Sequence, residues 1–406
     1  MLTRNRWIMQ IRDFTRNALV NIFATAIPLC VTQFIVLPYL SKSMSAEQYG
    51  VALTVISLFS LFSFCFGNVL SNIRLINNET YVRNGFDGDF NILLLFAGIL
   101  NALLVFFCAW YCEGEFRPLH QFLCVVIASV WLAREYYAVA FLIEINYKTI
   151  LYDNIVMSLG YLLGMVLYRR ISDWLWIYAI GQIAGLIYVM TKTAIWQEPL
   201  CRTPLFRTTL VQGAALQIGV FLSNFATYAD RVVLYPILGG EAVAVYFAAS
   251  FVGKMMSTAL LPINNVLFSY LAKMQNKSNK LFYCTILGTI ALATGGYLIC
   301  IFCSRSILAF LYPVLSVQAQ GYVAIATAAA CIGLVCSVAH SFILKFYDTR
   351  FILATNGATV LVYIIASIVL SNSYGLFGFC WATVASKVIK LACYITINAL
   401  YKAKQA

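Results

Sequence analysis

Lys254 is a charged residue near the middle of a long apolar segment, residues 242–271. About ten helical residues, at 1.5 Å each, separate it from either end of that segment, which is further than a lysine side chain extends. A charge inside a membrane-spanning helix is costly unless it has a partner, a water-filled cavity or an interface. We therefore expect Lys254 to face a hydrated cavity; the alternative is a neutral or paired lysine between packed helices.

Asp230 and Arg231 are adjacent charges in the preceding apolar segment, residues 209–237. Adjacent side chains of a helix point about 100° apart, so these two cannot pair cleanly with each other. Three polar residues precede Arg231 at spacings that place all four within an arc of roughly 80° on a helix: Gln217, Asn224 and Thr227. Such a polar stripe is expected to face protein or water; the alternative is that Arg231 extends to the outer interface while Asp230 bonds a neighbouring helix.

Arg134 and Glu135 form a third charged group, in the inner half of the segment 118–143. A cavity position and an ion pair between helices are equally open for Arg134. Glu144 and Asp153 lie near the cytoplasmic ends of their segments, where an interfacial position is favoured.

Lys387 and Lys390 lie three residues apart on one face of the last apolar segment, residues 375–401. Extension to the cytoplasmic interface explains them as well as a cavity does. Across all segments the deeper cations outnumber the deeper acids: Arg134, Arg231, Lys254 and Lys387 against Glu135 and Asp230. A cavity with surplus positive charge favours an anionic substrate such as a phosphate or diphosphate.

The chain has twelve long apolar segments, and the charges described above lie in some of them. Hydrophobic residues make up 62% of the 406 residues and charged residues only 10%, which excludes a soluble domain. A helix needs about 20 mostly apolar residues to cross a bilayer, and continuous rather than alternating apolar character argues against a β-barrel. We therefore predict an all-α polytopic membrane protein with about twelve transmembrane helices. The segments are 17–40, 48–72, 89–111, 118–143, 150–168, 173–194, 209–237, 242–271, 281–303, 317–343, 351–371 and 375–401.

The net charge of +12 follows membrane topology and does not indicate a nucleic-acid partner. If the N terminus is cytoplasmic, the outer loops hold only five basic residues: Lys42, Arg117, Arg169, Arg170 and Arg305. The cytoplasmic segments hold seventeen: Arg4, Arg6, Arg12, Arg16, Arg74, Arg83, Lys148, Lys192, Arg202, Arg207, Lys273, Lys277, Lys280, Lys345, Arg350, Lys402 and Lys404. Basic loops resist translocation, so this bias predicts that both termini are cytoplasmic.

The sequence around Pro38 and Tyr49 recurs around Pro236 and Tyr246. The prolines are offset by 198 residues and the tyrosines by 197, which is about half the chain. A duplicated membrane bundle is typical of transporters that rock one half against the other. We predict two six-helix lobes of the same orientation, comprising residues 1–200 and 201–406.

No constellation of residues indicates enzymatic or metal chemistry. His120 and His340, the two histidines, are isolated in the sequence, so structural or interfacial roles are favoured over metal binding. Cys300 and Cys303 have the spacing of a redox motif but no flanking ligands, so buried apolar thiols are favoured. The connections are too short for a soluble catalytic domain and carry no acid pair or histidine cluster. We expect a transporter without a cofactor or metal.

The second corner and its surroundings resemble the polysaccharide flippases of the MOP exporter superfamily. The matching residues follow in order: Asp230-Arg231, Gly239-Gly240, Tyr246-x-x-Ala249 and Pro262. Arg134-Glu135-Tyr136 is similar to the Arg-Glu-aromatic segment of the O-antigen (Wzx-type) members, and the corner around Pro38 fits the same group.

The resemblance implies two lobes around a central cavity that work by alternating access, with proton or sodium coupling. It implies an undecaprenyl-diphosphate-linked oligosaccharide as substrate, moved to the periplasmic leaflet of the bacterial inner membrane, and polysaccharide-assembly proteins as partners. The expected substrate-binding residues are Arg231, Lys254, Arg134, Asn224 and Gln217. Asp230 and Glu135 are the expected ion-coupling residues.

Two other classes of protein compete with this interpretation. A multidrug exporter of the same superfamily often has a coupling acid in the first or seventh helix; the segment 17–40 has none, but Asp230 lies in the seventh. A net cationic cavity suits a cationic drug poorly. A polysaccharide-assembly enzyme of the membrane, such as a polymerase, tends to carry a large periplasmic loop, which this chain lacks.

Overall fold

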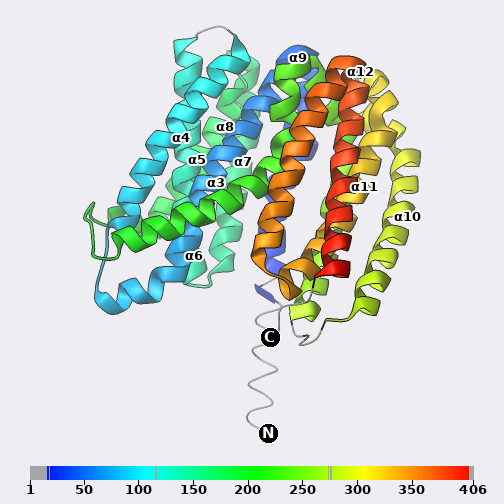
Figure 1. Cartoon of the computed structure of the whole chain (residues 1–406). Coiled ribbons are helices and arrows are strands. Elements are labelled where there is room, and N and C mark those ends of the chain that lie inside the picture. Colours follow the sequence, from blue (N-terminus) through cyan, green and yellow to red (C-terminus); the bar gives the residue numbers. More distant parts are fainter. Residues whose placement is uncertain (1–15, 18, 115–116, 273, 275–276, 402–406) are drawn as a thin grey trace. The chain divides into compact units, whose positions relative to one another are not determined.

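The computed structural model describes residues 16–17, 19–114, 117–272, 274 and 277–401. Within these ranges the chain consists of helices and short connections without a strand, which confirms the predicted all-α fold class (Figure 1). Both chain ends lie outside these ranges, so their cytoplasmic placement stays a prediction. The basic residues outside the described ranges are Arg4, Arg6, Arg12, Lys273, Lys402 and Lys404.

Ten helices within the described ranges are long and apolar enough to cross a membrane. The first of them, Leu19–Ser43, includes the π-helix η1 (Val31–Val36) and α2 (Leu37–Ser43). The helical elements that follow are α3 (Ala46–Asn84), α4 (Asp89–Glu113), α5 (Pro118–Tyr137), α6 (Val139–Ile143), α7 (Tyr147–Ile171), α8 (Leu175–Lys192), the 3-10 helix η2 (Ile195–Gln197), α9 (Phe206–Ala272), α10 (Asn279–Leu311), α11 (Ser316–Phe346) and α12 (Thr349–Leu400).

Two of these helices, α9 and α12, each cover two of the spans that the sequence predicts. α9 is broken at Gly239 (φ 80°, ψ −177°) and α12 at Gly375 (φ 59°, ψ −143°). Both glycines have a positive φ, which an L-residue with a side chain adopts only at a cost. The predicted spans 209–237 and 242–271 lie on either side of Gly239. The count of twelve stays a prediction, since ten helices of the described residues are long and apolar enough to cross a membrane.

Helix α3 is 39 residues long and extends beyond the predicted end at residue 72, to Asn84. The extension remains helical because Ile73 and Tyr81 are buried against Phe90 of α4. Packing against a neighbour thus outweighs the polar composition of this stretch.

Close packing divides the described chain into two compact units. Unit 1 comprises the described residues of 1–40 and 55–221, and unit 2 those of 41–54 and 222–406. Both α3 and α9 contribute residues to each unit, with the divisions at residues 54–55 and 221–222.

In unit 1, α7 and α8 pack backbone against backbone. A Cβ atom on Gly160 would lie 2.7 Å from the Cα atom of Gly181, and one on Gly164 would lie 2.5 Å from the Cα atom of Ile177. Small residues of this kind allow close helix contact in a membrane, where apolar burial gives little driving force between helices. Helix α5 packs against both α4 and α8.

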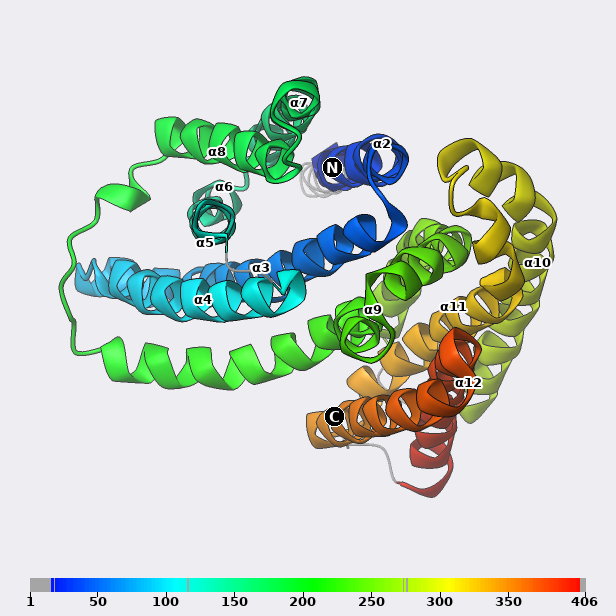
Figure 2. The ribbon, with the colours of Figure 1, turned by 90° about the horizontal axis from the view of Figure 1, so that it is seen from above.

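In unit 2, α11 packs beside both α10 and α12 (Figure 2). Phe282 of α10, Phe342 of α11 and Tyr394 of α12 are fully buried or nearly so in one apolar cluster. This cluster fixes α11 and α12, which carry two walls of the site described below.

The break in α9 is capped by a residue nearly 200 positions earlier in the chain. Glu47, in the first turn of α3, accepts hydrogen bonds from the backbone N–H groups of Gly240 (3.0 Å) and Glu241 (2.7 Å). These N–H groups begin the second half of α9 and lack helical partners, so a carboxylate satisfies them and complements the helix dipole. Tyr49 packs edge-on against Phe247 beside this cap.

Candidate functional site

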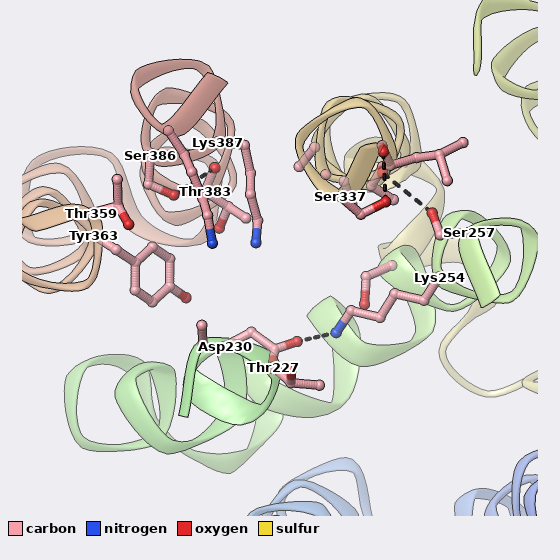
Figure 3. A pocket seen from close by; sticks show the side chains of 18 of the residues that line it. Thr227, Asp230, Lys254, Ser257, Ser337, Thr359, Tyr363, Thr383, Ser386 and Lys387 are labelled. Carbon is pink, nitrogen blue, oxygen red and sulfur yellow. Dashed lines mark hydrogen bonds and ion pairs between the residues drawn. The ribbon is translucent and has the colours of Figure 1, made fainter. Parts of the chain in front are cut away.

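A cavity of about 390 Å³ lies inside unit 2, between α9, α11 and α12. Its charged lining residues, among those described, are three lysines and one carboxylate: Lys254, Lys387, Lys390 and Asp230. Figure 3 shows Lys254 extending from α9 and Lys387 from α12 into the same space. The cavity therefore carries a surplus of positive charge.

Asp230 and Lys254 form an ion pair across the break in α9 (Figure 3). In a straight helix the 24 positions between them would amount to about 36 Å. The break at Gly239 turns the second half of the helix back on the first, which brings the two side chains into contact. The prediction that Lys254 faces a cavity and the alternative that it is paired both hold, because it lines the cavity and bonds Asp230.

The two members of this pair differ in exposure. The Asp230 side chain is 9% exposed, and its Oδ1 atom is buried without a hydrogen-bond partner among the described residues. The Lys254 side chain is 36% exposed and its Nζ lies 5.9 Å from the ring centre of Tyr246. The ammonium group of Lys254 is thus partly exposed to the cavity, while its ion pair with the more buried Asp230 restrains its position.

Lys387 and Lys390 line the cavity from α12. The Nζ of Lys390 lies 5.9 Å from the ring centre of Tyr394, and neither lysine has an ion-pair partner among the described residues. Sequence reasoning did not include them in the site, since a position near a helix end fits membrane-interface lysines equally well. The sequence signal that could have indicated a shared cavity was their spacing of three residues, which places both lysines on one face of the helix.

Hydroxyl groups make up most of the remaining polar lining. Several of them donate to backbone carbonyls of their own helix, as Thr258 does to Lys254 (2.9 Å) and Thr383 to Phe379 (3.1 Å). Their oxygens keep the capacity to accept hydrogen bonds from a ligand. The Tyr363 hydroxyl is buried without a hydrogen-bond partner among the described residues. The hydroxyl-bearing lining residues are Thr227, Tyr246, Ser250, Ser257, Thr258, Ser337, Thr359, Tyr363, Thr383 and Ser386.

Arg231 lies next to the cavity-lining Asp230 but is not itself part of the lining. Its guanidinium carbon lies 4.6 Å from the ring centre of Phe247, and the residue is 9% exposed. Phe247 in turn packs edge-on against Tyr312. The Arg231 guanidinium is thus stacked on the Phe247 ring, close to the break of α9.

Arg134 and Glu135 belong to unit 1 and are not among the residues that line the cavity. Arg134 donates two hydrogen bonds to the Asp153 carboxylate, at 2.5 and 3.2 Å, and one to Asn154 at 3.0 Å. Of the two alternatives for Arg134, the structure therefore has the ion pair between helices. Asp153, for which an interfacial position was favoured, is buried in this pair.

The predicted polar stripe on α9 is divided between the two units. Gln217 lies in unit 1 and Asn224 in unit 2, and neither lines the cavity. Thr227 is the member of the stripe that does.

His120 is isolated in the sequence but not in space. Its Nε2 lies 2.7 Å from a carboxylate oxygen of Glu113, and its Nδ1 lies 3.2 Å from Asp173. Cys300 and Cys303 are free thiols, as are the other cysteines of the chain.

The structure of this chain is similar to solved structures of transporters, although the sequence identities are low. No protein-family model matches the sequence, and no curated protein matches it. An inward closed conformation of the lipid II flippase MurJ matches with a TM-score of 0.74 and 14% identity, over 95% of this chain and 88% of that one. An inward-facing multidrug resistance MATE family transporter of the MOP superfamily matches with a TM-score of 0.68 and 10% identity, over 94% and 98%.

A third structure, a mutant of the Vibrio cholerae MATE transporter VcmN, matches with a TM-score of 0.59 and 12% identity, over 95% of this chain and 98% of that one. Identities this low establish the fold alone. The chain therefore has the fold that this lipid II flippase and these MATE transporters share.

Proposed function

We propose that this protein flips an undecaprenyl-diphosphate-linked O-antigen or polysaccharide repeat unit across the bacterial inner membrane, from the cytoplasmic to the periplasmic leaflet, by alternating access. The observation that carries the proposal is the composition of the cavity in unit 2, where three lysines face one carboxylate. Cations inside a protein are screened less than in bulk water, so an anionic ligand stabilises them. A diphosphate supplies that charge.

Lys254 is the central contact in this proposal. In the structure it is bound to Asp230, which compensates its charge. An entering diphosphate competes with Asp230 for Lys254, and Lys387 and Lys390 bind the rest of its charge from α12. The exchange of partners ties anion binding to a change at the break of α9.

The glycan and the lipid have separate places in the proposal. The hydroxyl-rich lining and the rings of Tyr246 and Tyr363 suit sugar hydroxyls and sugar faces. The lipid tail stays in the bilayer, so the protein need not desolvate it. Neighbouring polysaccharide-assembly proteins are the proposed source and recipient of the repeat unit.

Asp230 is the proposed coupling residue. A proton or sodium ion that binds its carboxylate weakens the hold on Lys254 and leaves the lysine free for the anion. The buried Oδ1 atom of Asp230, which has no hydrogen-bond partner among the described residues, is the position at which such an ion is expected to act. Arg231, Asn224, Gln217, Arg134 and Glu135 do not line the cavity, and their roles in substrate binding or ion coupling stay predictions.

Multidrug export is the second candidate, since MATE transporters share the fold. A cationic drug would meet three lysines in this cavity, and that repulsion favours the anionic substrate. Proteins that share the fold are transporters, which supports transport over an enzymatic role.

The test is complementation of a strain that lacks this gene. In the absence of the protein, lipid-linked repeat units should accumulate on the inner leaflet. Lys254→Arg should restore export in part and Lys254→Ala should not, although the variant inserts normally. Lys192→Ala, at an exposed position in unit 1, is the matched control and should export like wild type. Wild-type export by Lys254→Ala would refute the proposed site, and drug resistance without any effect on glycan export would favour the second candidate.

A further inference from the structure

We propose that unit 1 holds a divalent metal ion of the zinc class between His120, Glu113 and Cys124, with Asp173 orienting the histidine. The ligand atoms of the first three residues all lie within 4.8 Å of one another. All four residues belong to unit 1, and none of them lines the cavity described above. Nitrogen, sulfur and carboxylate oxygen together form a donor set typical of zinc.

Local helix geometry brings the three ligands together. Glu113 is the last residue of α4, and His120 lies near the start of α5. Cys124 follows His120 by four residues, so both side chains lie on one face of α5. Helices α4 and α5 pack against each other, which places the Glu113 carboxylate over that face.

Asp173 fixes the orientation of the imidazole. Its Oδ2 atom lies 3.2 Å from His120 Nδ1, and its Oδ1 atom accepts a hydrogen bond from the backbone N–H of Leu175 at 3.0 Å. With Nδ1 hydrogen-bonded to a carboxylate, Nε2 is left as the coordinating atom. This is the arrangement in which metal-binding histidines are usually held, with the second ring nitrogen on a carboxylate.

Glu113 has one satisfied and one unsatisfied oxygen. Oε2 accepts a hydrogen bond from the side chain of Gln121 at 3.1 Å. Oε1 is buried and lies 2.7 Å from His120 Nε2, but it receives no hydrogen bond of ordinary geometry from the described residues. A metal ion bound by both atoms would satisfy the Glu113 oxygen and the histidine nitrogen together.

The site is enclosed rather than superficial. Cys124 is fully buried, and the side chains of Glu113 and His120 are 12% and 19% exposed. Metal binding replaces the thiol proton of Cys124, which leaves to solvent, and no bond other than S–H is broken. Three protein ligands leave a fourth position for water. The ion would clamp the end of α4 to α5 and, through Asp173, to the connection before α8.

The experiment uses the full-length protein in nanodiscs after removal of metal with a chelator. We expect wild type to bind one equivalent of Zn²⁺ by titration calorimetry, and one equivalent of Co²⁺ with a sulfur-to-metal charge-transfer band. Cys124→Ser should abolish that band, and His120→Gln should abolish tight binding. Asp173→Asn should weaken binding about 10- to 100-fold, as loss of an orienting carboxylate does.

Cys380→Ser is the matched control, because Cys380 is equally buried but lies in unit 2. It should bind both metals like wild type. X-ray absorption of the zinc-loaded wild type keeps the proposal testable if a variant fails to fold, and one sulfur ligand is expected in the first shell. A first shell without sulfur, or equal zinc binding by wild type and His120→Gln, would overturn the proposal and leave an ion pair between His120 and its two carboxylates.

Discussion

Gly50 and Gly240 approach so closely that a Cβ atom on Gly50 would lie 1.8 Å from the carbonyl oxygen of Gly240. The two glycines lie just after Tyr49 and just after the break of α9, in the two corners of the sequence that resemble each other. The part of the first corner that belongs to unit 2, Ser41–Thr54, is therefore in direct contact with the second corner. This contact and the Glu47 cap beside it hold the break that brings Asp230 to Lys254.

Gly50→Ala should destabilise the protein by about 1–3 kcal/mol, since the added methyl group overlaps backbone that cannot move as a flexible side chain would. Thermal unfolding in detergent measures the effect. Gly98→Ala is the matched control, because Gly98 also lies inside a helix but has open space around it. It should be neutral or slightly stabilising. Equal stability of the two variants would show that the contact is not tight.

Glu47→Ala should cost about 0.5–2 kcal/mol of stability, because it leaves two N–H groups at the start of the second half of α9 without a cap. Glu47→Gln keeps one acceptor oxygen and should recover part of the loss. Glu79→Ala removes an acid from the same helix whose ion pair with Arg83 is exposed, and should change stability by less than about 0.5 kcal/mol. The ranking from chemical or thermal unfolding checks the prediction, and a Glu47→Ala variant as stable as Glu79→Ala contradicts it.

Arg134→Ala should destabilise unit 1 by about 3–5 kcal/mol, because it leaves the Asp153 carboxylate buried without its partner. Replacing both residues with apolar ones, as in Arg134→Met with Asp153→Leu, should recover most of that stability. The double-mutant cycle measured by unfolding gives the coupling between them. A folded Arg134→Ala protein with normal stability and a specific loss of substrate binding would instead place Arg134 at the substrate.

Joint replacement of Lys387 and Lys390 with alanine should weaken binding of inorganic diphosphate by tenfold or more, about 1.4 kcal/mol, since two of the three cavity lysines are lost. Isothermal titration of the purified protein at low and moderate salt measures the change, which should shrink as salt rises. Replacing the exposed Lys192 with alanine should leave the affinity unchanged. Unaltered diphosphate affinity in the double variant would remove α12 from the anion site.

Asp230→Asn should tighten diphosphate binding and slow export, because it removes the only carboxylate among the described cavity-lining residues and the competitor of the anion for Lys254. We expect about a tenfold gain in affinity, or about 1.4 kcal/mol. Transport should also lose its dependence on pH or sodium. Measuring binding and turnover on one preparation separates the two effects, and a variant that keeps wild-type ion dependence would exclude Asp230 as the coupling residue.

Composition and the length of the apolar segments were sufficient to predict the fold class and an unusual position for Lys254. They depend on local sequence, because each span must be apolar over about 20 residues and a charge within one is conspicuous. Local sequence did not predict that Asp230 is the ion-pair partner of Lys254. Asp230 and Lys254 belong to different turns of what is formally one helix, and their contact depends on the backbone of Gly239.

The cluster around His120 was missed for a related reason. Glu113, His120 and Asp173 come from three separate segments, and a histidine that is isolated in the sequence gives no sign of neighbours from other helices. For Arg134 the sequence left two alternatives open, a cavity position and an ion pair between helices. An arginine within a membrane span has the same sequence signature in both cases. The choice depended on Gly185 of α8, which leaves room for its side chain: a Cβ atom there would lie 2.5 Å from Arg134 Nε.

Unit 2 includes fourteen residues, Ser41–Thr54, from the first half of the gene. A fragment that begins at Leu222 would therefore lack Glu47 for its cap and Tyr49 for the face of Phe247. The two halves of the gene could be expressed as separate polypeptides only if both were made in the same cell and joined during membrane insertion. If the two corners descend from a duplication, the second half of the gene now encodes a unit that is incomplete without residues 41–54 of the first half.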